Sequence, residues 1–401
     1  YILYITGVLA SYDGHSQPTK PNIIVINCDD MGYGDLSCFG SPTIKTPNID
    51  RMAIEGQKWS SFYVSASVSS PSRAGLLTGR LGVRTGMYGD QRRVLFPDSK
   101  GGLPSEELTI AELLKQAGYH TACIGKWHLG HLPEYMPLRH GFDYFYGYPY
   151  SNDMSPVQNK GAHARNFPPT PLILDGKEIE SEPDQGELTR RYTEKAVSFI
   201  KDHSKEPFFL YFAHTFPHIP LYTNARFEGT SKRGLYGDVV EEIDWSVGEV
   251  LKALRENGLD ENTFVIFTSD NGPHHEGGAD PDFFKSYGPF RGIKRDVYEG
   301  GIRIPMVAWC PGTIKAGAQS DHISAFWDVM PTLAELTGTV LPEKTDGISF
   351  LPTLLSKKDQ QAHDYLYWEF HELNGREALR SGKWKLIRQP IVGETILELY
   401  D

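Results

Sequence analysis

Short, uninterrupted apolar runs alternate along this chain with longer segments whose apolar residues recur at helical spacing. Residues 23–26, 208–212 and 264–267 are continuous runs of aliphatic and aromatic side chains, which are typical of strands buried on both faces. Residues 188–202 and 236–257 instead place apolar side chains three or four positions apart, as amphipathic helices do. Strands that alternate with helices favour an α/β fold, with a large, mostly parallel sheet sandwiched by helices.

Capping signals mark the starts of further helices. Thr46 followed by Pro47 is typical of a residue that caps a helix and of the first helical position. Thr109 and Glu112 have the spacing of a capping box. The other elements that we expect are helices at residues 46–56, 109–118 and 327–336 and strands at 119–124 and 305–309.

The pattern changes at about residue 359. Residues 365–370 and 383–388 alternate apolar and polar side chains, which predicts short strands of a small antiparallel sheet. We therefore divide the chain into an N-terminal signal remnant or disordered tail (1–20), a main α/β domain (21–358) and a C-terminal subdomain (359–401).

The N-terminal residues 1–10 are apolar but too few to span a bilayer, and no other stretch approaches a membrane span. They resemble the hydrophobic part of a secretion signal whose basic beginning is missing. No Asn-x-Ser/Thr acceptor occurs in the sequence, whereas a lysosomal or secreted animal glycoprotein would usually carry one. We expect an exported bacterial protein, periplasmic or extracellular.

Composition adds two constraints. The net charge of −11 at pH 7 makes a nucleic-acid partner unexpected, because it implies no broad basic surface. The four cysteines, Cys28, Cys38, Cys123 and Cys310, lack zinc-ligand spacing. We interpret them as mostly buried free thiols, and a Cys28–Cys38 bridge stays open as an alternative.

Polar residues follow four of the predicted strands. They are Asp29 and Asp30, then Lys126 and His128, then His218, and finally Asp270 and Asn271. Ligands of open α/β sheets bind beyond the carboxyl ends of the strands. We therefore expect these side chains to meet in one site.

The acidic pairs among them suggest a metal. Adjacent carboxylates such as Asp29 and Asp30 repel unless a cation or a proton holds them together. With Asp270 and Asn271 they form an all-oxygen set, which suits a hard cation such as Ca²⁺ or Mg²⁺. For either pair alone, a turn with Asx hydrogen bonds is the competing interpretation.

A third motif begins at Ser69. Ser69 and Ser70 precede Pro71, which suits the first turn of a helix. Free N–H groups at such a helix start face an anion, and Arg73 adds a permanent charge close by. This arrangement suits a nucleophile held against an oxyanion ester, although a serine cap beside a surface arginine would also fit.

Residues 69–80, Ser-Ser-Pro-Ser-Arg followed by Ala-Gly-Leu-Leu-Thr-Gly-Arg, resemble the signature of type I sulfatases, the arylsulfatase A-like family of the alkaline phosphatase superfamily. The resemblance implies that a maturation enzyme oxidises Ser69 to formylglycine, an aldehyde; cysteine is commoner at this position. It also implies that Asp29, Asp30, Asp270 and Asn271 hold a calcium ion, with Mg²⁺ less expected, and that the side chain of residue 69 completes the metal shell. Because sulfatases usually continue beyond such a point, we expect the C-terminal subdomain to be incomplete here.

The same resemblance assigns the sulfate contacts. It implies that Lys126, His218 and Lys294 contact the sulfate, and that Ser151 joins them more weakly. Arg73 would ease formation of an oxyanion, His218 would be the general acid for the departing alcohol, and His128 would be the base for sulfate release or its orienter. Taken singly, these lysines and histidines are more often surface or packing residues. His214 has no motif support and is expected to be structural or a pocket residue.

The resemblance thus implies a sulfuric ester hydrolase acting on a sulfated carbohydrate. Residues 144–153 could line a sugar pocket or could equally belong to the core. Two alternatives stay open at this point. One is a phosphate or phosphonate ester hydrolase of the same superfamily with unmodified Ser69 as nucleophile. The other is a catalytically silent binder of sulfated glycans, in which Ser69 is unmodified or replaces an original cysteine.

Overall fold

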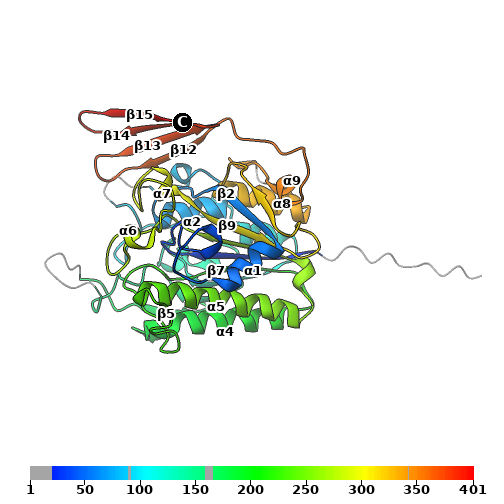
Figure 1. The fold of residues 1–401 in the computed structure, drawn as a ribbon. Coiled ribbons are helices and arrows are strands. Elements are labelled where there is room, and N and C mark those ends of the chain that lie inside the picture. The colour runs from blue at the N-terminus through cyan, green and yellow to red at the C-terminus, as the bar shows by residue number, and fades with distance from the viewer. Residues whose placement is uncertain (1–19, 89–91, 159–165, 342) are drawn as a thin grey trace, which may run out of the picture.

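The computed structural model describes residues 20–88, 92–158, 166–341 and 343–401. In these residues a large sheet forms the middle layer, helices cover both its faces, and a separate four-stranded sheet lies at the C-terminus (Figure 1). The expected α/β class and the small antiparallel C-terminal sheet are confirmed. Residues 1–19 of the predicted signal remnant or tail lie outside the described residues.

The large sheet is mostly parallel, with antiparallel pairs on either side of its parallel centre. Its strands, in spatial order, are β10 (Ala318–Ser320), β2 (Gln57–Tyr63), β9 (Arg303–Trp309), β8 (Thr263–Ser269), β1 (Asn22–Cys28), β7 (Phe208–Ala213), β3 (His120–Lys126), β4 (Tyr144–Tyr148), β5 (Pro171–Leu174) and β6 (Lys177–Ser181), with β11 (Ser324–Ala325) beside β2. Strands β8, β1, β7, β3 and β4 are all parallel to one another. Strand β9 is antiparallel to both β8 and β2.

Alternate residues of β1 point to opposite faces of the sheet and explain the two helical layers. Ile23 and Val25 belong to one apolar core, and Ile24 and Ile26 belong to the other. The first core is covered by α2 (Ser69–Thr78), α3 (Ile110–Gln116) and α8 (Val329–Thr337). The second is covered by α1 (Pro47–Glu55), α4 (Leu188–Asp202) and α5 (Gly234–Glu256) (Figure 1).

Short helical segments connect these layers. They are α6 (Pro281–Phe284), α7 (Glu299–Ile302), α9 (Leu351–Leu354) and the 3-10 turns η1 (Ser37–Phe39), η2 (Gly82–Arg84), η3 (Pro133–Tyr135), η4 (Pro137–Arg139), η5 (Gln185–Glu187), η6 (Asp260–Asn262) and η7 (Phe326–Asp328). The predicted capping box is present before α3, where Glu112 N donates to Thr109 Oγ1 and Thr109 N donates to Glu112 Oε2.

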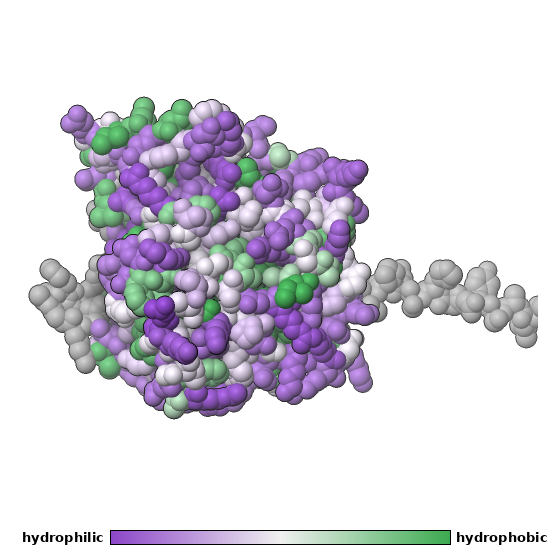
Figure 2. Space-filling model, viewed as in Figure 1, coloured by the Kyte–Doolittle hydropathy of each residue, from purple (hydrophilic) through white to green (hydrophobic). Residues whose placement is uncertain are grey.

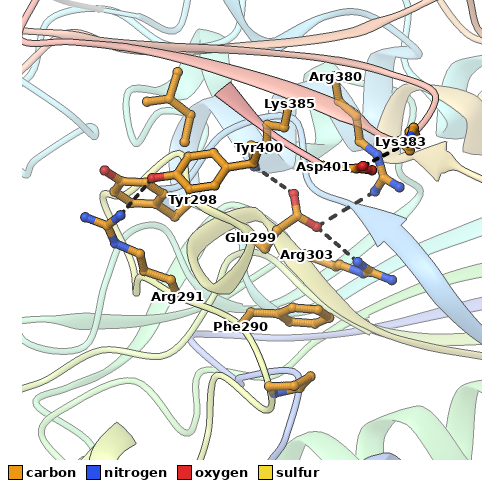
Figure 3. Close-up of a pocket in the computed structure, with 12 residues that line it drawn as sticks. Phe290, Arg291, Tyr298, Glu299, Arg303, Arg380, Lys383, Lys385, Tyr400 and Asp401 are labelled. Carbon is orange, nitrogen blue, oxygen red and sulfur yellow. Dashed lines mark hydrogen bonds and ion pairs between the residues drawn. The ribbon is translucent and has the colours of Figure 1, made fainter. Parts of the chain in front are cut away.

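The C-terminal sheet packs against the segment that leads into β9. It consists of β12 (Leu366–Phe370), β13 (Arg376–Ser381), β14 (Trp384–Gln389) and β15 (Ile396–Tyr400). Between the sheet and this segment lies a pocket of about 450 Å³ whose polar centre is Glu299 (Figure 3). Glu299 accepts hydrogen bonds from Lys385 on β14, from Arg303 on β9 and from Tyr63 on β2. One carboxylate thus joins the small sheet to the large one.

The surface is largely hydrophilic, but apolar side chains gather on the C-terminal sheet, at the top of the view (Figure 2). Ile396, Leu397 and Leu399 on β15 are each more than half exposed. Within the part of the chain that the structure describes, no helix combines the length and apolar character needed to cross a bilayer. All four cysteines are free thiols, so the Cys28–Cys38 bridge does not form.

Candidate active site

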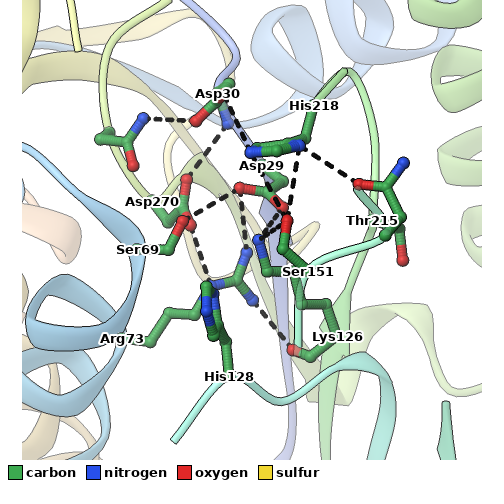
Figure 4. Close-up of polar contacts among 12 residues, drawn as sticks. Asp29, Asp30, Ser69, Arg73, Lys126, His128, Ser151, Thr215, His218 and Asp270 are labelled. Atoms are coloured by element: carbon green, nitrogen blue, oxygen red, sulfur yellow. Dashed lines mark hydrogen bonds and ion pairs between the residues drawn. The ribbon is translucent and has the colours of Figure 1, made fainter. Parts of the chain in front are cut away.

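Four adjacent parallel strands bring the predicted polar residues to one edge of the sheet. Asp270 and Asn271 follow β8, Asp29 and Asp30 follow β1, His218 lies in the connection after β7, and Lys126 ends β3. The registers align these ends, since Cys28 pairs with Ser269, and Ala213 pairs with both Asn27 and Gly125. The expected convergence of strand ends is therefore present (Figure 4).

Close backbone packing places Lys126. Gly125 has a φ of 110°, and a Cβ atom built on it would lie 1.8 Å from the carbonyl oxygen of Ala213. A Cβ on Gly147 of β4 would lie 1.8 Å from the carbonyl oxygen of Gly125. Only glycine permits these approaches, and they seat the fully buried Lys126 side chain beneath the site.

Ser69 is the first residue of α2, at the end of the helix where backbone N–H groups are free. Its side chain is buried and its Oγ donates a 3.2 Å hydrogen bond to Asp29 Oδ1. Ser70 Oγ accepts from Leu95 N at 3.0 Å, which ties the start of the helix to the loop that borders the pocket.

Arg73, one turn further along α2, holds two of the acids. Its Nε donates to Asp270 Oδ2 at 2.9 Å and its Nη1 donates to the Lys126 carbonyl at 2.9 Å. Nη2 lies 3.7 Å from Asp29 Oδ1. Burial opposes the charge of Arg73, but Asp270 and Asp29 hold its pKa above the ordinary value. Arg73 is therefore a fixed cation under the acids.

Asp29 and Asp30 each have a lysine partner as well. Lys126 Nζ donates to Asp29 Oδ2. Burial and the nearby charge of Arg73 lower the pKa of Lys126, although the negative charge of Asp29 acts in the opposite direction. Lys294 Nζ lies 2.7 Å from Asp30 Oδ1 and 2.8 Å from Asp30 Oδ2. Burial would raise the pKa of Asp30, yet Lys294 and then His218 bring it well below the usual range. Asp30 is therefore ionised.

The set fits a divalent metal ion. Asn271 Nδ2 donates to Asp30 Oδ1 at 2.7 Å, while the buried Oδ1 of Asn271 has no hydrogen-bond partner among the described residues. Burial and then the Asp29 charge raise the pKa of Asp270 to about 6, which a neighbouring cation would reverse. Ligand atoms of Asp29, Asp30 and His218 lie within 4.8 Å of one another. Three carboxylates with a free amide oxygen are donors that a hard cation prefers.

His218 stands beside these acids and above Lys126. Its Nδ1 lies 2.5 Å from the Ile219 carbonyl and 3.2 Å from Asn152 Oδ1, and its Nε2 lies 3.7 Å from Asp30 Oδ2. Ser151 Oγ accepts from Lys126 Nζ at 3.2 Å and lies 3.5 Å from the His218 ring. Burial, followed by Lys294, lowers the pKa of His218 to about 4. The free protein thus holds this ring neutral at pH 7.

His128 faces the same pocket from the opposite side. Its backbone has a φ of 61°, and its Nε2 lies 2.9 Å from the Leu95 carbonyl. Its buried Nδ1 has no hydrogen-bond partner among the described residues. Burial and then Lys126 hold the pKa of His128 well below the ordinary value, so a neutral ring presents an unpartnered nitrogen.

These residues surround a pocket of about 110 Å³. Of the predicted site residues, its lining includes Ser69, His128, Ser151, His218 and Lys294. Asp29, Asp30, Arg73, Lys126, Asp270 and Asn271 contact these residues or one another beneath it (Figure 4).

His214 lies elsewhere and has a structural role. It is fully buried, packs on Phe212, and its Nε2 lies 3.4 Å from Ser246 Oγ. Residues 144–153 are divided between the core and the lining of the pocket. Tyr146 and Tyr148 belong to the core, whereas Ser151 and Asp153 line the pocket.

The sequence interpretation missed several residues of the lining. His274 stacks on His218 with ring centroids 6.4 Å apart and planes inclined by 5°. His274 lies three residues after Asn271, so its closeness to a predicted metal ligand could have identified it as a candidate site residue. Arg295 directly follows Lys294, whereas Arg93 belongs to no motif. Asp153 and Glu276 complete the polar lining.

Comparisons with known proteins identify the family of this chain. The sulfatase family matches residues 21–339, and the C-terminal family of N-sulphoglucosamine sulphohydrolase matches residues 288–401. N-acetylgalactosamine-6-sulfatase of Mus musculus is 43% identical over 376 residues, which is 88% of this chain and 69% of that protein. Arylsulfatase A of Bos taurus is 40% identical over 95% of this chain and 77% of its own length.

Solved structures show the same fold. The crystal structure of Ps i-CgsB in complex with k-i-k-neocarrahexaose has a TM-score of 0.82 and 31% sequence identity, and covers 95% of this chain and 86% of that chain. The matches to family models, the sequence identities and the shared fold all point to the same family. The chain belongs to the sulfatase family and is a sulfuric ester hydrolase.

Proposed function

We propose that this protein removes O-sulfate from a sulfated carbohydrate, with Ser69 matured to formylglycine and a calcium ion held by Asp29, Asp30, Asp270 and Asn271. The observation that carries the proposal is the meeting of Ser69 Oγ, three buried carboxylates and three buried cations at the base of one pocket. The sulfated-sugar part is supported by relatives named N-acetylgalactosamine-6-sulfatase and by the similar structure in complex with k-i-k-neocarrahexaose.

The charges of the site suit a sulfate monoanion. Asp29, Asp30 and Asp270 are matched by Arg73, Lys126 and Lys294, so the protein groups alone are close to neutral. A bound divalent ion would supply the positive charge that stabilises the sulfuryl oxygens, and a hydrated aldehyde at residue 69 would supply the nucleophilic oxygen. The enclosed pocket limits solvent screening of these charges.

The lysines can bind the sulfuryl group directly. Lys126 donates to Asp29 and Ser151, and Lys294 donates to Asp30, so N–H donors remain on both. Arg73 acts beneath them, since its bonds to Asp270 and to the Lys126 carbonyl fix where these groups stand. We assign Lys126 and Lys294 to sulfate binding and Arg73 to positioning the acids.

His218 and His128 are suited to two different proton transfers, one to the departing sugar oxygen and one away from residue 69. A bound sulfate ester adds negative charge beside His218, which raises its pKa and favours the imidazolium that protonates the departing sugar oxygen. His128 is neutral and has a free Nδ1, so it can accept the proton that is removed when sulfate leaves. Both rings are neutral in the free protein, and the charge of the bound ester then favours the protonated form of His218, whereas His128 stays available as a base.

The first experiment is an assay of sulfate and phosphate release from matched sugar esters. N-acetylgalactosamine 6-sulfate, glucosamine 6-sulfate and galactose 6-sulfate are compared with their 6-phosphates, using protein from a host that matures serine-type sulfatases. We expect sulfate release, with a peptide covering residue 69 that is lighter by two hydrogens. Turnover of phosphates but not sulfates would reject the proposal and favour an unmodified Ser69 nucleophile, and tight binding without turnover would favour a silent glycan binder.

Replacing His218 by glutamine should affect sugar sulfates far more than 4-nitrophenyl sulfate. A sugar alkoxide is a poor leaving group and needs a proton, so kcat should fall by about 10² to 10⁴-fold. The 4-nitrophenolate ion leaves without protonation, so its kcat should change much less. The measurement is kcat for both substrates in the wild-type protein and in H218Q.

The control for this prediction is His214→Gln, because His214 is also a buried histidine but does not line the pocket. H214Q should change both rates by a similar factor through stability alone. If H218Q slowed both substrates equally, His218 would not be the general acid.

A further inference from the structure

Two arginines, Arg93 and Arg295, line the pocket but have no part in the proposed mechanism. They share the lining with Lys294 and His274, whereas Lys126 is fully buried and is not part of the lining. Neither is fully exposed, since the Arg93 and Arg295 side chains retain 31% and 29% of their accessible surface. They are therefore part of the pocket wall.

The backbone of Arg295 is held in a conformation that arginine rarely adopts. Its φ is 76°, and Asp30 and His128 in the same site have φ values of 67° and 61°. Such conformations persist where the surroundings enforce them and are concentrated at functional sites. Arg295 N donates to the Ser67 carbonyl at 3.0 Å, and its own carbonyl accepts from Arg376 Nη1 at 3.0 Å.

Arg93 is held in a similar way from the same direction. Its backbone N and its Nη1 each lie 2.9 Å from the Glu372 carboxylate, one bonded to Oε1 and the other to Oε2. Glu372 lies between β12 and β13, and Arg376 begins β13. The C-terminal sheet therefore fixes both arginines at the pocket.

Both guanidinium groups keep donors for a ligand. Arg295 Nε is buried and has no hydrogen-bond partner among the described residues, and its Nη1 lies 3.8 Å from Glu276, beyond hydrogen-bond distance. Glu372 bonds only Nη1 of the Arg93 side chain. Burial and then the nearby charge of Arg93 lower the pKa of Arg295, as expected for two cations brought together. A second anion would relieve this repulsion.

We propose that Arg93 and Arg295 form a second anion position at the mouth of the sulfate pocket, so that the preferred substrate carries another sulfate or a carboxylate near the ester that is cleaved. This inference rests on the proposed function, because it takes the pocket beneath to hold the first sulfate. An arginine guanidinium can bond the oxygens of a sulfate or of a carboxylate. The expected ligand group is therefore an oxyanion of either kind, on the sugar that carries the cleaved ester or on the adjacent sugar.

The test measures binding by calorimetry in the Ser69→Ala background, where turnover cannot interfere. The ligands are N-acetylgalactosamine 6-sulfate, its 4,6-disulfate, and the 6-sulfate linked to either glucuronic acid or glucose. We expect the 4,6-disulfate or the glucuronic acid conjugate to bind more tightly than its singly charged partner. Tighter binding of the 4,6-disulfate would identify a sulfate as the second anion, and tighter binding of the glucuronic acid conjugate would identify a carboxylate.

Variants then assign the effect to the arginines. Arg295→Met and Arg93→Met should each weaken binding of the doubly charged ligand about 10- to 100-fold more than binding of the singly charged one. Arg295→Lys should recover part of the preference, and Glu372→Gln should reduce it by releasing Arg93. The matched control is Arg388→Gln, since Arg388 pairs with Glu377 on the same sheet and does not line the pocket; its preference should equal that of the parent.

Two failures are distinguishable. If no sulfated sugar binds, the proposed function fails and the inference fails with it. If the singly sulfated sugar binds but a second anion brings no gain, or if R295M weakens both classes equally, the second anion position is rejected while the sulfatase function stands.

Discussion

Replacing Ser69 by alanine should abolish sulfate release, lowering kcat by about 10⁴-fold or more, as the loss of a covalent nucleophile does in other hydrolases. Ser69 Oγ is the side-chain oxygen at the start of α2 that contacts Asp29, and alanine can be neither matured to an aldehyde nor used as a nucleophile. The measurement is kcat on a sulfated sugar and on 4-nitrophenyl sulfate. Both should fall together, because the nucleophile is needed whatever the leaving group.

Ser72→Ala is the matched control. Ser72 lies on the same helix, is fully buried, and its Oγ has no hydrogen-bond partner among the described residues. Its loss removes a hydroxyl of the same kind without touching Asp29, so activity should stay within about twofold of the parent. Activity of S69A above about one per cent of the parent would show that another group attacks sulfur.

Removing the divalent ion should lower kcat by at least about 100-fold, because the ion supplies several kcal/mol of charge stabilisation. Without it, Asp29, Asp30 and Asp270 are a crowded buried set, and Asp270 has a pKa raised to about 6. The ion binds the carboxylate form, so its affinity should fall as pH falls through 6. The measurements are activity and metal content after dialysis against a chelator, followed by titration with Ca²⁺ or Mg²⁺.

Two variants locate this ion. Asp270→Asn should lose the bound metal and the activity. Asp282→Asn should lose neither, because Asp282 belongs to an exposed group with His275 and Asp280, apart from the pocket lining. An unchanged metal content in D270N, or full activity in metal-free protein, would contradict the assigned site.

Local patterns predicted the elements well. The helix expected at residues 188–202 is α4 with the same bounds, and the capping box at Thr109 is formed as expected. The apolar runs at 208–212 and 264–267 lie within β7 and β8. These features follow from side-chain periodicity and from hydrogen bonds between near neighbours, so few distant residues are needed to specify them.

Pairing direction and order could not be obtained in this way. Residues 305–309 are a strand as expected, but β9 runs antiparallel between β8 and β2. Strand β2, with its mixed sequence Gln-Lys-Trp-Ser-Ser-Phe-Tyr, was not predicted. The side-chain pattern of a buried strand is the same for either direction, so the contacts with its neighbours decide.

The sequence by itself determined the α/β class and the polar residues that follow the strands, because side-chain periodicity and short motifs specify both. It also supplied the residues that we propose for a metal and sulfate site. Only the tertiary structure decided which strand ends are adjacent and that Asn271 Oδ1 has no hydrogen-bond partner among the described residues. It also decided that Arg93 and Arg295 line one pocket, where Glu372 bonds Arg93 and Arg376 bonds the Arg295 carbonyl. Arg93 and Arg295 are about two hundred residues apart in the chain, and contacts with distant segments, among them Ser67, Glu372 and Arg376, hold them at the same pocket.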